Sequence, residues 1–114
     1  MAEKGSASVG TTAIAQSGEP LNARFDRLAQ QWKRDTAFTS SLSKIYGHPA
    51  YQEIISMGPP ALHLVLLSLE QQPDHWFAAL EALTGENPVP PSDAGNITSM
   101  RAAWLQWAKQ RNLL

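Results

Sequence analysis

The stretch "GHPAYQEIISMGPPALHLVL", residues 47–66, decides the fold because it contains two helix ends and two helix starts. Gly47 is predicted to end one helix in a left-handed conformation, and Gly58 is predicted to end the next. Pro49 and Pro59 suit the first position of a helix, where the N–H that proline lacks would be unpaired anyway. The stretch therefore predicts two short helices that join at Gly58 and form an antiparallel hairpin.

The second helix of this hairpin is expected to lie at the centre of the fold. Its apolar residues surround the helix axis: Ala61, Leu62, Leu64, Val65, Leu66, Leu67 and Leu69. A helix that is apolar nearly all round is normally buried between its neighbours. The apolar run is also far shorter than the roughly 20 residues that span a bilayer, so no membrane partner is expected.

Further helices are predicted on both sides of the hairpin, because apolar residues recur there every three or four positions. In chain order they are a helix over about 21–35 with Leu21, Phe25, Leu28 and Trp32; a short helix with Phe38, Leu42, Ile45 and Tyr46; a helix over about 75–84 with Trp76, Phe77, Leu80 and Leu83; and a last helix with Met100, Ala103, Trp104 and Trp107. Asp74 is the expected N-cap of the helix over 75–84, Gly85 its left-handed end, and Asn96 or Thr98 the start of the last helix. No segment alternates with period two, so the fold class is all-α, a small bundle of five to six short helices.

Length and composition indicate one small domain. The chain has 114 residues, of which 43% are hydrophobic, and a formal net charge of -1. Residues 1–20 are rich in Ser, Gly, Ala and Thr and are predicted to be a disordered tail, which leaves residues 21–114 as a single helical domain. The chain has no cysteine and no secretory signal pattern, so we expect a cytoplasmic protein from a reducing compartment.

Two resemblances follow from these patterns. The order of helix, Gly-Pro-Pro and helix in "YQEIISMGPPALHLVLLSL", followed by "PDHWFAALEALTG", resembles the helix pairs of HEAT-type repeats over about 35 residues. That resemblance implies a HEAT-like hairpin at the centre of the bundle and a surface for other proteins. The words "HPAY", "PDHWF" and "TGENPVP" resemble a family of small bacterial proteins of uncharacterised function over about residues 25–114. The second resemblance implies no activity, ligand or functional residue.

The sequence contains no pattern typical of catalysis or of metal binding. His48, His63 and His75 are the only histidines, and none has a partner at the spacing of a helical metal motif. His63 is expected to bond a carbonyl at the edge of the core, and Asp74 before His75 is interpreted as a helix cap. Neither a nucleophile elbow nor a Gly-rich phosphate loop occurs. We therefore expect a protein that is not an enzyme and that uses no metal or cofactor.

Charges are segregated along the chain. No Lys or Arg lies between Ile45 and Met100, where six carboxylates occur. If the first and last helices packed side by side, their cations would form one patch that attracts phosphate in a salt-dependent way. The alternative is that the basic ends pair with the acidic middle. A nucleic-acid-associated regulator is therefore the second functional hypothesis, with these candidate residues: Arg24, Arg27, Lys33, Arg34, Arg101, Lys109 and Arg111.

Tryptophan and proline residues are the candidates for binding another protein. Trp104 and Trp107 share one face of the last helix, and tryptophan is a frequent interface anchor, although core packing is the alternative. Pro88 and Pro91 in "PVPP" have the spacing of a polyproline docking site. The function we expect is a protein–protein interaction module, such as a small adaptor or an antitoxin-like inhibitor. Its partner would be another protein, and a core of this size also favours self-association.

Overall fold

The computed structural model describes residues 19–114, so the predicted disordered tail lies, apart from its last two residues, outside the described part of the chain. Six α-helices and one 3-10 helix make up this part: α1 (Leu21–Asp35), α2 (Leu42–Tyr46), α3 (Pro49–Ser56), α4 (Pro59–Gln71), α5 (Phe77–Thr84), η1 (Pro91–Asp93) and α6 (Ile97–Gln110). Residues 19–114 contain no strand. The predicted all-α class, a small bundle of short helices, is therefore confirmed.

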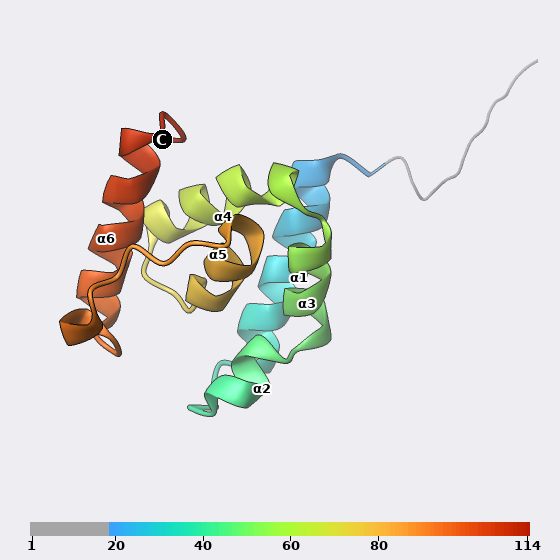
Figure 1. Cartoon of the computed structure of the whole chain (residues 1–114). Helices are drawn as coiled ribbons and strands as arrows, with labels where there is room; N and C mark the ends of the chain where they lie inside the picture. The colour runs from blue at the N-terminus through green and yellow to red at the C-terminus, as the bar shows by residue number, and fades with distance from the viewer. Residues whose placement is uncertain (1–18) are drawn as a thin grey trace, which may run out of the picture.

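The helix α4 lies at the centre of the bundle, as its apolar sequence predicts. It packs against α1, α5 and α6, and Figure 1 shows α1 and α6 on opposite sides of it. The helix α3 runs alongside α1 in the opposite direction and also contacts α5 (Figure 1). Residues far apart in sequence thus meet around α4, which separates the first helix from the last.

The junction between α3 and α4 is a corner and not the antiparallel hairpin that the sequence suggests. The helix α3 packs mainly against α1, while α4 turns away to bridge α1 and α6 (Figure 1). Gly58 forms the corner with φ +77° and ψ -158°, a combination essentially restricted to glycine. The HEAT-like hairpin is therefore not confirmed, because Gly-Pro-Pro determines where the helices end but not the angle between them.

We expect Gly58→Ala to lower the free energy of unfolding by about 1–3 kcal/mol, because a Cβ is strained at this backbone conformation. No heavy atom lies within 4 Å of the position that the new Cβ would take. The expected loss is therefore backbone strain and not a steric clash. Equilibrium unfolding in urea measures the difference. A loss under about 0.5 kcal/mol, the range of ordinary surface substitutions, would contradict a corner that depends on glycine.

Several helix ends form as predicted, and others form differently. Gly85 ends α5 in the left-handed conformation with φ +71°, and the side chain of Asn96 caps α6. The left-handed end predicted at Gly47 is wrong, because φ there is -83°. A Cβ at Gly47 would lie 2.7 Å from the backbone oxygen of Ser43, so close approach accounts for the glycine. The N-cap of α5 is Trp76 and not Asp74.

Four aromatic side chains from α1, α3 and the start of α5 form the centre of the core. The Trp76 ring centroid lies 4.6 Å from that of Trp32, 5.6 Å from that of Phe25 and 5.7 Å from that of Tyr51. All four side chains are buried. Aromatic pairs at these separations add stabilisation beyond the area that they bury. The core positions predicted for Phe25, Trp32 and Trp76 are confirmed, and we call these four residues the aromatic cluster.

Tyr51 connects the aromatic cluster to the backbone at the start of α5. Its hydroxyl donates a hydrogen bond to the carbonyl of His75 at 3.0 Å and accepts one from the N–H of Ala79 at 2.8 Å. The first N–H groups of a helix have no partner inside the helix, so the phenol supplies one that the sequence of α5 lacks. Burial is the main cause that raises the pKa of the Tyr51 phenol well above its usual value.

Phe38 departs from the predicted core. The sequence places it on one apolar face with Leu42 and Ile45, but its side chain is 103% exposed and that of Leu42 is 51% exposed. The reason is that α2 begins only at Leu42, so Phe38 lies in the connection before it and helical spacing does not apply. Ile45 is the buried residue of α2. The connection between α1 and α2 therefore carries an exposed aromatic ring.

Candidate protein-binding groove

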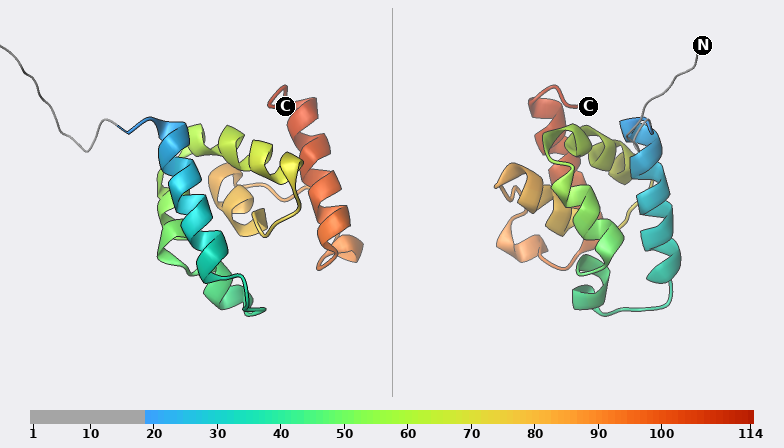
Figure 2. Two further views of the ribbon diagram at one scale, coloured as in Figure 1. Left: turned by 180° about the vertical axis from the view of Figure 1, so that it is seen from behind. Right: turned by 90° about the vertical axis from the view of Figure 1, so that its right-hand side faces the viewer.

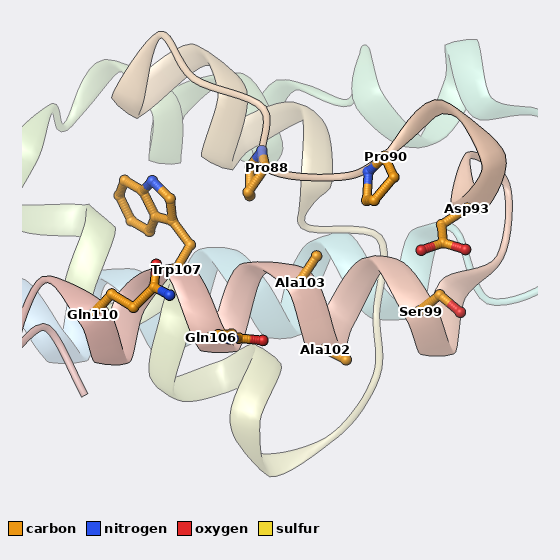
Figure 3. Close-up of a pocket in the computed structure, with 9 residues that line it drawn as sticks. All are labelled: Pro88, Pro90, Asp93, Ser99, Ala102, Ala103, Gln106, Trp107 and Gln110. Carbon is orange, nitrogen blue, oxygen red and sulfur yellow. The ribbon is translucent and has the colours of Figure 1, made fainter.

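An open groove follows α6 on the side that faces the connection from α5. Its volume is about 450 Å³, which is within the range of small-ligand and peptide sites. Figure 3 shows the connection running alongside α6, with the groove between them. The lining residues are Pro88, Pro90 and Asp93 from the connection and Ser99, Ala102, Ala103, Gln106, Trp107 and Gln110 from α6.

The proline segment forms one wall of the groove for a local reason. Pro88 and Pro90 line the groove, whereas Val89 between them packs against the hydrophobic core. Pro90 has the polyproline-like φ of -62° and ψ of 147°, and a chain in this conformation turns by about 120° per residue, so the middle residue points away from the side that its two neighbours share. Val89 thus anchors the segment, while the two pyrrolidine rings face α6 across the groove. Ala103 leaves space opposite them because its side chain is small (Figure 3).

Trp107 closes one end of the groove and is held there by two charged residues. Its Nε1 donates a hydrogen bond to Oε1 of Glu86 at 3.2 Å, and Arg111 donates to the same oxygen at 3.0 Å. The guanidinium carbon of Arg111 also lies 4.4 Å from the Trp107 ring centroid, a cation–π contact. Trp107 is 7% exposed. Its ring lines the groove in a fixed position and does not project into solvent, as an interface anchor would.

The other two residues predicted to bind a partner lie outside this groove. Trp104 is fully buried, and its ring packs edge-on against Trp107 with 5.2 Å between the centroids. Its Nε1 finds no hydrogen-bond partner within residues 19–114. The core alternative is therefore the correct one for Trp104. Pro91 starts η1 and does not line the groove, so Pro90 takes the place that the PxxP spacing assigned to Pro91.

Sequence reasoning missed the residues that α6 contributes to the groove. Ser99, Ala103, Gln106 and Gln110 follow one another at spacings of four, three and four, which places them on one helical face. This small and polar stripe is a signal that could have identified the groove side of α6. It escapes a search for apolar periodicity because none of its members is large and hydrophobic.

The cations of the nucleic-acid hypothesis do not meet in one patch, because α4 lies between α1 and α6 (Figure 1). Five of the seven are bound within the chain: Arg24 to Glu53 at 2.8 Å, Arg27 to Glu19 at 3.0 Å, Lys33 to Asp74 at 3.7 Å, Arg111 to Glu86 at 3.0 Å, and Arg101 to the carbonyls of Leu69 and Glu70. Among the described residues, Arg34 and Lys109 form no ion pair. These ion pairs agree with the alternative interpretation of the sequence, in which the basic ends of the chain pair mainly with its acidic middle.

The rings of His48 and His63 have structural partners. Nδ1 of His48 accepts the N–H of Ala50 at 3.0 Å, so the ring proton is on Nε2, which lies 2.8 Å from Oδ2 of Asp35. Both ring nitrogens are engaged, which leaves none to act as a general base. Nδ1 of His63 bonds the carbonyl of Leu113 at 2.9 Å, as predicted. Residues 19–114 contain no group of three or more His, Asp or Glu placed to hold a metal ion.

Comparisons with known protein families, with curated proteins and with solved structures give no match. The resemblance to a family of small bacterial proteins therefore stays a prediction. None of the helices in residues 19–114 combines the length and the apolar character needed to cross a membrane. On the surface of the domain, the groove along α6 is the feature that brings proline and tryptophan together.

Proposed function

We propose that this protein is a non-enzymatic protein–protein interaction module whose groove along α6 binds an extended segment of another protein. The observation that supports the proposal is the groove itself, open along its length and bounded by Pro88 and Pro90 on one side and α6 on the other. Gln106 and Gln110 carry amide donors and acceptors along the helix, which are suited to the backbone of an extended peptide.

The two ends of the groove indicate the chemistry of the bound segment. Asp93 lines one end and forms no ion pair with residues 19–114, so a Lys or Arg of the partner would be its natural counterpart. Trp107 lines the other end, and Ala103 lies between them on the side of α6 that faces the prolines (Figure 3). A basic residue followed by small apolar residues or proline is the expected pattern of the partner.

Ala102→Trp is the variant that tests this proposal, because Ala102 lines the groove from an exposed helix position and an indole there adds bulk to the lining. The tagged wild type and the variant are used in parallel to capture proteins from the native cells after nuclease treatment. We expect the stoichiometric partner to be recovered at least about tenfold less by the variant, the effect of losing one good contact. The matched control is Ala23→Trp, which adds the same ring to an exposed position of α1.

A partner recovered equally by both variants would show that the groove is not its binding site. Material that is lost only on nuclease treatment would instead favour the nucleic-acid hypothesis. Selection of peptides from a random display library, with removal of those that also bind Ala102→Trp, tests the chemistry of the occupant. We expect enrichment of peptides with Lys or Arg near one end, and enrichment of acidic peptides would contradict the role given to Asp93.

A further inference from the structure

A second unusual surface lies at the end of the molecule where α1 and α2 are connected. Phe38 is 103% exposed and Leu42 is 51% exposed, and among large hydrophobic residues of the described chain only Leu21 is also exposed. Both views in Figure 2 place this connection at the opposite end of the molecule from the C-terminus. The Phe38 ring contributes nothing to the core. A partner that covers it would therefore gain most of the free energy of removing this ring from water.

Two exposed cations accompany these apolar side chains. Arg34 lies in the last turn of α1 and Lys44 in α2, and neither forms an ion pair with residues 19–114. The carboxylate of Asp35, next to Arg34, accepts a hydrogen bond from Nε2 of His48 at 2.8 Å and is half-exposed, so two cations accompany one carboxylate here. Arg34 precedes Phe38 by four residues and Lys44 follows Leu42 by two, and all four are exposed. We call these four residues, around the connection of α1 and α2, the basic tip.

We propose that the basic tip binds the surface of an anionic lipid bilayer. Phe38 and Leu42 would enter the boundary between headgroups and acyl chains, while Arg34 and Lys44 would lie at the lipid phosphates, which is the combination that holds interfacial segments on membranes. This contact is peripheral and needs no spanning helix. It differs from the sequence-based expectation of no membrane partner, which rested on the short length of the apolar run.

The shape and the charge of the basic tip favour a bilayer over a protein. A stable protein interface takes roughly 20–30 residues on each side, whereas a lipid surface accepts one or two projecting side chains. A second copy of the chain would bring the Arg34 and Lys44 side chains of both copies together, which like-charge repulsion disfavours. The inference does not depend on the proposed function of the groove, because the two surfaces use different elements.

Co-sedimentation of the full chain with vesicles tests the proposal. We expect binding to vesicles made of equal parts phosphatidylcholine and phosphatidylglycerol, little binding to phosphatidylcholine alone, and a loss of binding between about 50 and about 500 mM salt. Phe38→Ser should reduce the bound fraction at least about tenfold, since one buried aromatic ring is removed from the contact. Lys44→Glu should reduce it in the anionic vesicles. Leu21→Ser, at the other end of α1, is the matched control and should bind as the wild type does.

A fluorescent label placed on the tip gives a second measurement. The chain has no cysteine, so Ala37→Cys creates a single labelling site beside Phe38, and Thr98→Cys creates one on α6. An environment-sensitive dye at position 37 should shift to shorter wavelength with anionic vesicles, while the dye at position 98 should not. Failure of the wild type to bind anionic vesicles more than neutral ones, or equal binding by Phe38→Ser, would overturn the proposal.

Discussion

Trp76→Ala is expected to lower the free energy of unfolding by about 3–5 kcal/mol, the range for removing a fully buried tryptophan. The reason is its position between the rings of Trp32, Phe25 and Tyr51, all within contact distance. Its Nε1 also donates to the hydroxyl of Ser68 at 3.2 Å. A domain of this size has only a few kcal/mol of net stability, so the variant should be largely unfolded at room temperature.

Urea unfolding followed by far-ultraviolet circular dichroism measures this loss, with Phe38→Ala as the control. Both substitutions remove an aromatic ring, but Phe38 is fully exposed. The control should change the free energy of unfolding by less than about 0.5 kcal/mol. Similar losses in the two variants would contradict the arrangement of the aromatic cluster, because they would mean that Phe38 is as buried as Trp76.

Tyr51→Phe is expected to cost about 1–3 kcal/mol, although it removes a single oxygen atom. The ring stays in the aromatic cluster, but the carbonyl of His75 and the N–H of Ala79 lose their hydrogen-bond partner. Water cannot replace the hydroxyl at a side chain that is 0% exposed. Thermal and urea unfolding of the two proteins at neutral pH measure the difference. An unchanged stability would show that the start of α5 finds other partners.

The same pair of proteins gives a test at alkaline pH. Burial raises the pKa of the Tyr51 phenol in the folded state, so the unfolded chain releases this proton first as the pH passes about 10. Tyr51 therefore stabilises the fold fully below the unfolded pKa, and this contribution falls by about 1.4 kcal/mol for each pH unit above it. The stability gap between the wild type and Tyr51→Phe should be smaller by about that amount at pH 11 than at pH 8. An equal gap at both pH values would contradict the burial of the phenol.

The helices could be predicted from the sequence because their ends are encoded locally. Pro49 and Pro59 begin α3 and α4, Gly85 ends α5 and Asn96 caps α6, each through its own backbone or side chain. The angle at Gly58 could not be predicted in this way. Glycine permits many conformations. The one adopted here depends on the packing of α3 against α1, whose residues are distant in sequence.

Exposure was the property that sequence spacing predicted least well. Phe38 and Ile45 fall on one apparent stripe, but only Ile45 lies inside a helix that packs on the core. Trp104 and Trp107 also share one face in the sequence, but only Trp107 lines the groove beside the proline segment. Half of the groove could be predicted because Pro88 and Trp107 are conspicuous residues. The other half depends on alanines of α6. Their small side chains leave an open space only because the proline segment runs at a distance from the helix.

The position of the aromatic cluster along the chain has a consequence for protein synthesis. Its four rings come from residues 25 to 76, so a nascent chain can complete them while α6 is still inside the ribosome. The helix α6 packs against α4, where Arg101 bonds the carbonyls of Leu69 and Glu70, so these contacts can form only later in synthesis. The groove is complete only after Gln110 has emerged. Under the proposed function, a partner would therefore bind only chains in which this residue has left the ribosome.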